Sequence, residues 1–299
     1  MIDLNVKKNA SRMGIALILF MFIGEIFVPA LMRSICDAAG WEIPDTPAAT
    51  LLLGTLPMYL VAIPLTWLFI RKMPRRIPNH RSPAPLWFLI LLPITLFIMV
   101  TGGIIGNGLV EILQDIFPLT IKNISVDAVN KAPLWLQLTI AVLIGPFFEE
   151  LLFRKLLMDR LMVYSSRNAI LLSAICFGLF HGSLHQIFYT VGMGIILAGL
   201  YQNTGNLLFP WALHALANFI AGILPGLVKG AWANTYYTAY ILICCLGLVL
   251  LVVHRNMLKP NDEPQDLPRD LTTPAMYSNP GMIAYYSVCV LFTILYIVG

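Results

Sequence analysis

Nine long apolar runs restrict what this chain can fold into more than any other feature. Each is about 20 residues long, the length that an α-helix needs to cross the hydrocarbon core of a bilayer. A backbone in lipid must satisfy its own hydrogen bonds, so these runs predict helices. We therefore expect an all-α, polytopic transmembrane helix bundle of about eight to nine spans. The runs lie at residues 13–32, 48–70, 85–106, 134–157, 168–184, 187–202, 207–224, 236–253 and 281–298.

The shortage of charge leads to the same class of protein. Only 11% of the 299 residues are charged, whereas soluble domains have about 25%. This composition excludes a soluble enzyme, a disordered tail and a disulfide scaffold. The net charge of +4 is too small and too scattered to indicate a nucleic-acid partner. The partner that the apolar runs predict is the lipid bilayer around the helices.

The placement of lysine and arginine predicts how the spans are oriented. The segment 71–76, which continues to Arg81, is strongly basic and indicates a cytoplasmic loop. With a cytoplasmic N-terminus and a retained first span, 14 of the 19 basic residues fall on the cytoplasmic side. The proline-rich stretch near 255–280 then becomes a cytoplasmic loop. Four basic residues fall outside: Arg33, Lys122, Lys131 and Lys229.

The strongest functional signal is Glu149-Glu150-Leu151-Leu152-Phe153-Arg154, set in an apolar run. Ionisable groups at membrane depth cost about 2.5–3.5 kcal/mol each on insertion scales, so they are rare and usually functional. Glu150 and Arg154 are four residues apart and can pair on one helix face. Glu149 points elsewhere, free to act as a general base. The alternative is that these residues lie at a helix end, where their charged side chains reach the membrane–water interface.

Two further spans carry polar side chains that need an explanation. Phe177 and His181 form a Phe-x-x-x-His pattern, and the short turn near 165–166 should pair this span with the preceding one. His214 and Asn218 share one helix face, and both can donate to an oxyanion. Each pattern alone is equally compatible with packing hydrogen bonds between helices. Together with Glu149 they make a set suited to activating water.

In order and spacing, these three motifs resemble those of the CPBP intramembrane proteases, also called the CAAX protease and bacteriocin-processing, or Abi, family. The resemblance covers about 134–224, including the lead-in Thr204-Gly205-Asn206-Leu207. It implies a protease core on three spans within 134–224. The apolar runs outside it predict N-terminal transmembrane helices at 1–133 and C-terminal transmembrane helices at 225–299.

The resemblance also implies roles for the motif residues. Glu149 would activate water with the help of His181, and His214 and Asn218 would stabilise the oxyanion. Glu150 and Arg154 would hold the site together. A water-filled cavity opening toward the cytoplasm would bring water and a substrate tail to it.

A metal is a second option for this site. Glu149, His181 and His214 could supply a zinc site with two histidines, one carboxylate and an open position for water. The usual His-Glu-x-x-His signature is absent. The favoured mechanism is glutamate-dependent and needs no cofactor.

The leading hypothesis is an intramembrane endopeptidase that hydrolyses a bond in a membrane-associated protein or peptide, in a bacterial cell membrane. A non-catalytic membrane scaffold or bacteriocin self-immunity protein of the same family is the alternative. A proton-coupled transporter is a third candidate, but no inverted repeat supports it.

Overall fold

The computed structural model describes residues 2–78, 86–256 and 262–298, and in these residues every regular element is a helix. In chain order the α-helices are α1 (Ile2–Met21), α2 (Val28–Ala39), α3 (Pro47–Pro57), α4 (Ile63–Ile70), α5 (Leu86–Ile116), α6 (Ile124–Lys131), α7 (Leu134–Leu136), α8 (Gly145–Glu150), α9 (Asp159–Leu161), α10 (Ser166–Phe180), α11 (Ile187–Thr204), α12 (Leu208–Asn218), α13 (Leu224–Leu227), α14 (Ala231–Val253), α15 (Arg269–Tyr277) and α16 (Pro280–Val298). Five π-helical segments join some of them: η1 (Phe22–Phe27), η2 (Met58–Ala62), η3 (Gln137–Ile144), η4 (Leu151–Met158) and η5 (Phe219–Ile223).

Seven continuous helices in this part of the chain are long and apolar enough to cross a membrane, which makes the protein a multi-pass integral membrane protein. They are Asn5–Ala39, Pro47–Ile70, Trp87–Ile116, Leu134–Leu161, Leu208–Leu227, Ala231–Val253 and Pro280–Ile297. The number is lower than the eight to nine spans expected. The difference lies in α10, which has only 15 residues, and in α11, whose 18 residues end in the polar Gln202, Asn203 and Thr204.

The helix α10 is shorter than the apolar run that predicts it. It ends at Phe180 because Gly182 has a φ of +57° and turns the chain away from the helix axis. Only glycine adopts that conformation at little cost. His181 therefore stands at the end of α10, in the turn that leads to α11.

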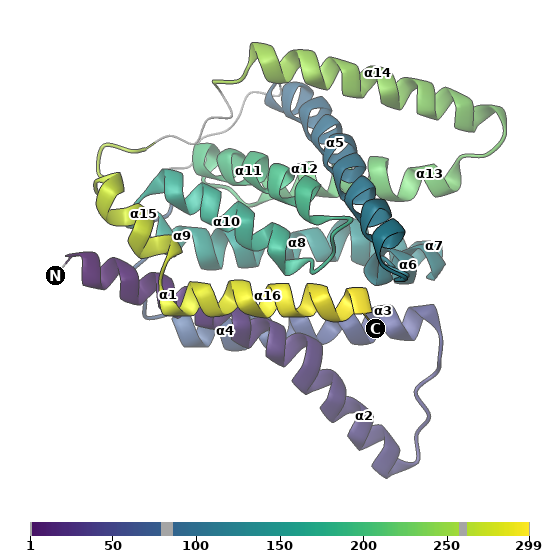
Figure 1. Cartoon of the computed structure of the whole chain (residues 1–299), viewed down its shortest axis with the longest axis horizontal. Coiled ribbons are helices and arrows are strands. Elements are labelled where there is room, and N and C mark those ends of the chain that lie inside the picture. The colour runs from purple at the N-terminus through teal and green to yellow at the C-terminus, as the bar shows by residue number, and fades with distance from the viewer. Residues whose placement is uncertain (1, 79–85, 257–261, 299) are drawn as a thin grey trace.

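Most helices run along one direction, so the bundle has two distinct ends (Figure 1). The N-terminus, α9 and α15 lie at one end. The helices α6 and α7 and the C-terminus lie at the other. We call the first the basic end, because the segment 71–76, Arg160, Arg167 and Arg269 belong to it, and the second the α6 end.

A network of polar contacts closes the basic end. Asp266 accepts hydrogen bonds from the Arg76 guanidinium and from the backbone N–H of Ser166, both at 2.7 Å. The Asn168 side chain donates to the Thr272 hydroxyl at 3.0 Å. These bonds fasten the segment before α15, and α15 itself, to the start of α10.

The stretch near 255–280 is therefore more than a loop, which corrects the sequence prediction. Residues 269–277 form α15, which packs against α1 and α10. Prolines suggested a linker, but Pro268 immediately precedes α15 and Pro280 begins α16, positions where a helix tolerates proline. Arg81 and residues 257–261 of the proline-rich stretch lie outside the described residues.

Glycines allow the first and last spans to approach closely. A Cβ atom on Gly14 would lie 2.3 Å from the carbonyl carbon of Gly281, and one on Gly281 would lie 1.9 Å from the carbonyl oxygen of Ser11. The Ser11 hydroxyl accepts a hydrogen bond from the Gly281 N–H at 2.9 Å. Small residues at such a crossing let two membrane helices gain backbone contact.

We expect Gly281→Leu to separate α1 from α16 and lower the stability of the protein by about 1–3 kcal/mol, as overpacking does. Thermal unfolding in detergent measures this loss. Gly199→Ala in α11 is the matched control, because a Cβ there meets no atom within 4 Å. Equal melting temperatures for Gly281→Leu and the wild type would contradict the close approach of α1 and α16.

Candidate active site

The two glutamates lie on a short α-helical segment between two π-helical ones. The helix α8 starts with Gly145 and Pro146 and ends at Glu150, with η3 before it and η4 after it. Pro146 has no N–H to donate, so the helical ladder is interrupted there. Wider π turns are frequent at functional sites, because they redirect side chains and release backbone carbonyls.

Glu150 and Arg154 form the ion pair that their spacing predicts. The Arg154 Nε donates to Glu150 Oε2 at 2.8 Å, and both side chains are completely buried. The Arg154 Nη1 donates to the Ser173 hydroxyl on α10 at 2.7 Å. That hydroxyl in turn donates to the Phe153 carbonyl at 3.0 Å. The pair thus fastens η4 to α10 with its charges satisfied.

Phe177, the first residue of the Phe-x-x-x-His pattern, fills the space between the charged pair and the histidines. Its ring meets the rings of His181 and His214 edge to face, with centroids 4.9 Å and 5.7 Å apart. The Arg154 guanidinium lies over the same ring at 5.5 Å. Phe177 therefore sets the positions of three polar side chains at once.

His214 lies between the two glutamates and is buried. Its Nδ1 is 3.1 Å from Glu150 Oε1, and its Nε2 is 3.7 Å from Glu149 Oε2. Glu150 is ionised by its pairing with Arg154 and can only accept, so the Nδ1 carries a proton. The Nε2 can then donate toward Glu149 only when the imidazole carries both protons. Glu149 thus finds its partner on another helix, which spacing within its own helix could not show.

Asn218 fixes α12 against η3. Its side-chain N–H donates to the Ala141 carbonyl at 3.1 Å. Trp211, two turns earlier, donates to the Leu143 carbonyl at 2.9 Å. Both acceptors belong to the π-helical segment η3. One N–H of the Asn218 amide remains for another partner.

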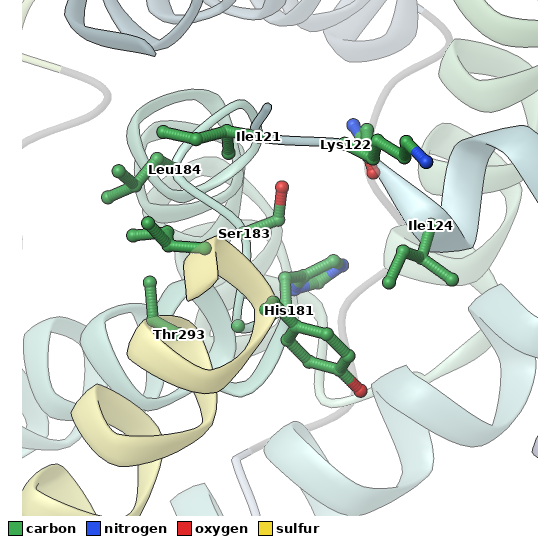
Figure 2. Close-up of a pocket in the computed structure, with 11 residues that line it drawn as sticks. Ile121, Lys122, Ile124, His181, Ser183, Leu184 and Thr293 are labelled. Atoms are coloured by element: carbon green, nitrogen blue, oxygen red, sulfur yellow. The ribbon is translucent and has the colours of Figure 1, made fainter. Parts of the chain in front are cut away.

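His181 stands where α10 ends. Its Nδ1 donates to the Phe177 carbonyl at 2.8 Å, so in the neutral ring the Nε2 is the acceptor. Figure 2 shows His181 in a small pocket with Ser183, Ile124 and Thr293, which come from three separate segments. This pocket has about 20 Å³, enough for one water molecule. Among the described residues the buried Ser183 hydroxyl has no partner.

A much larger cavity of about 830 Å³ brings the predicted residues together. Glu149, His181, His214 and Asn218 all line it. Glu149 has 22% of its side chain exposed there, whereas Glu150 is completely buried. The two adjacent glutamates therefore differ in surroundings: one is fixed in an ion pair and the other faces open space.

The cavity reaches the surface at the α6 end, away from the basic loops, because the exposed residues Thr50, Val126 and Asn130 line it. Its rim includes Thr50 at the start of α3, Asn123 and Asn130 around α6, and Pro225 in α13. If the cavity opened toward the cytoplasm, as expected above, the basic loops at the opposite end of the bundle would have to lie on the extracytoplasmic side of the membrane. The expected cytoplasmic opening and the cytoplasmic N-terminus cannot both be right.

The residues do not fit the zinc site considered above. Within the part of the chain that the structure describes, no three His, Cys, Asp or Glu side chains lie close enough together to hold a metal ion. Both nitrogens of His214 face carboxylates, and the Nδ1 of His181 is bonded to a backbone carbonyl. We therefore assign no step to a metal.

Sequence reasoning missed several residues of the cavity wall. Tyr59 stacks on Phe148 with ring centroids 4.7 Å apart, and Tyr189 lines the wall from α11. Glu25 on η1 lines it as well, and its lone carboxylate in an apolar span was the signal that could have placed it there. Tyr59 and Tyr189 carry no such signal, because aromatic residues are common throughout these spans.

Comparisons with known proteins agree with this core. Residues 131–220 match the family described as type II CAAX prenyl endopeptidase Rce1-like, which is what this part of the chain is similar to. A Bacillus subtilis (strain 168) protein named "Putative membrane peptidase YdiL" is 30% identical over 101 residues. The match covers 33% of this chain and 40% of that protein, so the chain spans well under two thirds of its relative. No solved structure matches the chain significantly.

We expect Arg154→Met to destabilise the protein by about 3–5 kcal/mol, because it leaves the Glu150 carboxylate buried without its cation. The double variant Glu150→Gln/Arg154→Met removes that charge and should recover part of the loss. Thermal unfolding of the purified proteins measures both effects.

Arg33→Met is the control for this pair, because Arg33 is exposed on α2 and such surface changes stay within about 0.5 kcal/mol. If Arg154→Met were as stable as Arg33→Met, the buried pair would not support the fold.

Proposed function

We propose that this protein is an intramembrane endopeptidase of the CPBP, CAAX-protease type. It hydrolyses a peptide bond of a membrane-associated protein or peptide with a water molecule activated by Glu149. The observation that carries the proposal is the difference between the adjacent glutamates: Glu150 is buried against Arg154, and Glu149 faces a cavity with two histidines and an amide.

In the proposed reaction Glu149 takes a proton from water as the oxygen attacks the substrate carbonyl. His181 accepts a hydrogen bond through its Nε2 and orients that water, because its Nδ1 is bonded to the Phe177 carbonyl. The proton on Glu149 then passes to the departing amine. The oxygen of the attacked carbonyl becomes negative and needs donors nearby.

Asn218 and His214 supply those donors. Asn218 uses one amide hydrogen to hold Ala141 and keeps the other for the oxyanion. His214 would donate through Nε2 in its doubly protonated form, because its Nδ1 faces Glu150.

Glu149→Gln should lower cleavage by at least about 10²-fold, because a general base contributes 10²–10⁴. We would compare protein termini in membranes of cells that express the wild type or Glu149→Gln at equal levels. New N- and C-termini present only with the wild type would name substrates and place Glu149 in the reaction.

Asp127→Asn is a matched control for the loss of one carboxylate, because Asp127 is exposed on α6; it should give the wild-type termini. Identical termini for wild type and Glu149→Gln, with both folded and a wild-type phenotype retained in the variant, would favour a scaffold or bacteriocin self-immunity protein.

Asn218→Ala should retain substrate binding and lower the maximal rate by about 10²–10³-fold, the usual cost of losing an oxyanion donor. The measurement is kcat and KM on a substrate identified from the new termini. A change confined to KM would contradict the role of Asn218 in stabilising the oxyanion.

A further inference from the structure

The cavity lies mainly in one half of the bundle. The helices contribute to its wall mostly through the parts that point to the α6 end. From α5, for example, the wall residues run from Met99 and Val100, just before its midpoint, to Gly103 and Asn107 after it. From α16 they are Phe292 and Tyr296, close to its end.

The other half of the bundle is filled. The helix that carries Glu149 continues for 12 residues to Leu161, about 18 Å at 1.5 Å per residue. The buried core residues along that stretch are Leu152, Phe153, Leu156, Leu157, Met158 and Leu161. Beyond them the contacts of Asp266 with Arg76 and Ser166 close the basic end. A polypeptide arriving from the basic end would have to displace this packed layer.

Charge is distributed very unequally between the two ends. Among the described residues, twelve lysines and arginines belong to the segments at the basic end. The connections at the α6 end carry four basic residues against six acidic ones, which are Asp37, Glu42, Asp45, Glu111, Asp115 and Asp127. Loops rich in lysine and arginine remain in the cytoplasm during membrane insertion, and this bias sets the orientation of the protein.

From these observations we infer that the site is reached from the extracytoplasmic face of the membrane. The substrate class is then a segment of a membrane-anchored or secreted polypeptide on that face, rather than the cytoplasmic tail of a protein. This inference rests on the proposed function for its substrate, but the direction of access stands on geometry and charge alone.

The cavity wall fits an extended peptide segment. Most of the wall is apolar, and five side-chain amides are distributed over it: Asn107, Asn123, Asn130, Gln186 and Asn218. An amide side chain offers both a donor and an acceptor, which is what the peptide groups of an unpaired strand require. Unwound backbone in an apolar environment must find such partners.

Cysteine accessibility tests the direction of access without a substrate. In a full-length Cys36→Ser/Cys245→Ser background, which removes the two cysteines that are not buried, single cysteines replace Asn130 at the rim, Gly54 in the wall and Lys72 at the basic end. Gly54 tolerates the change because a Cβ there meets no atom within 4 Å. Bacterial spheroplasts are treated with a charged, membrane-impermeant methanethiosulfonate before and after permeabilisation.

We expect Asn130→Cys and Gly54→Cys to be modified in intact spheroplasts, and Lys72→Cys only after permeabilisation. The reverse pattern would overturn the inference and place the cavity on the cytoplasmic side. A Gly54→Cys that reacts from neither side, with Asn130→Cys reactive, would overturn it too, because the cavity would then be closed to water.

The background variant without an added cysteine measures reaction at the three buried cysteines. Glu149→Gln in each labelled variant should leave the pattern unchanged. If the wild type cleaves nothing, the proposed function fails while the labelling pattern still decides the direction of access.

Discussion

The buried Glu150–Arg154 pair is the interaction on which the rest of the site depends. Two full charges in a membrane-spanning helix are tolerable only when each is paired and its remaining hydrogen-bonding groups are satisfied. Here the Ser173 hydroxyl accepts from the guanidinium, the Phe177 ring covers its face, and His214 faces the second carboxylate oxygen of Glu150. Satisfying the pair therefore requires α10 and α12 to pack against η4. The same contacts bring His181 and Asn218 to the cavity that Glu149 faces.

Departures from regular α-helix are concentrated around the cavity. Four of the five π-helical segments contribute to its wall: η1 through Glu25, η2 through Tyr59, η3 through Ala141 and η5 through Gly222. The fifth, η4, contains Arg154. A π turn has a wider radius and leaves carbonyls without a helical donor. In lipid those carbonyls would be costly, but at a water-accessible wall they can accept from side chains, as Ala141 accepts from Asn218.

Much of the fold follows from the sequence, because lipid allows so few solutions. Seven of the nine predicted spans coincide with helices long and apolar enough to cross a membrane, and the four-residue spacing predicted the contact between Glu150 and Arg154. The features that the sequence did not predict depend on how the helices pack against one another. The 3.7 Å approach of Glu149 to His214 depends on how α8 and α12 cross. The helix α15 was missed because its residues are polar and its stability comes from contacts with α1 and α10.

The side on which the cavity opens depends on how the helices pack, which no local sequence pattern reports. Glu149, His181 and His214 lie in one cavity, but that alone does not say from which face of the membrane the cavity is reached. Only the packed layer between Glu149 and the basic end separates the two directions, and that layer is made of ordinary leucines, phenylalanines and methionines. Such residues carry no functional signal in a sequence. They fill one half of the bundle, which leaves the other half as the route by which, on the proposed function, water and a peptide would meet Glu149.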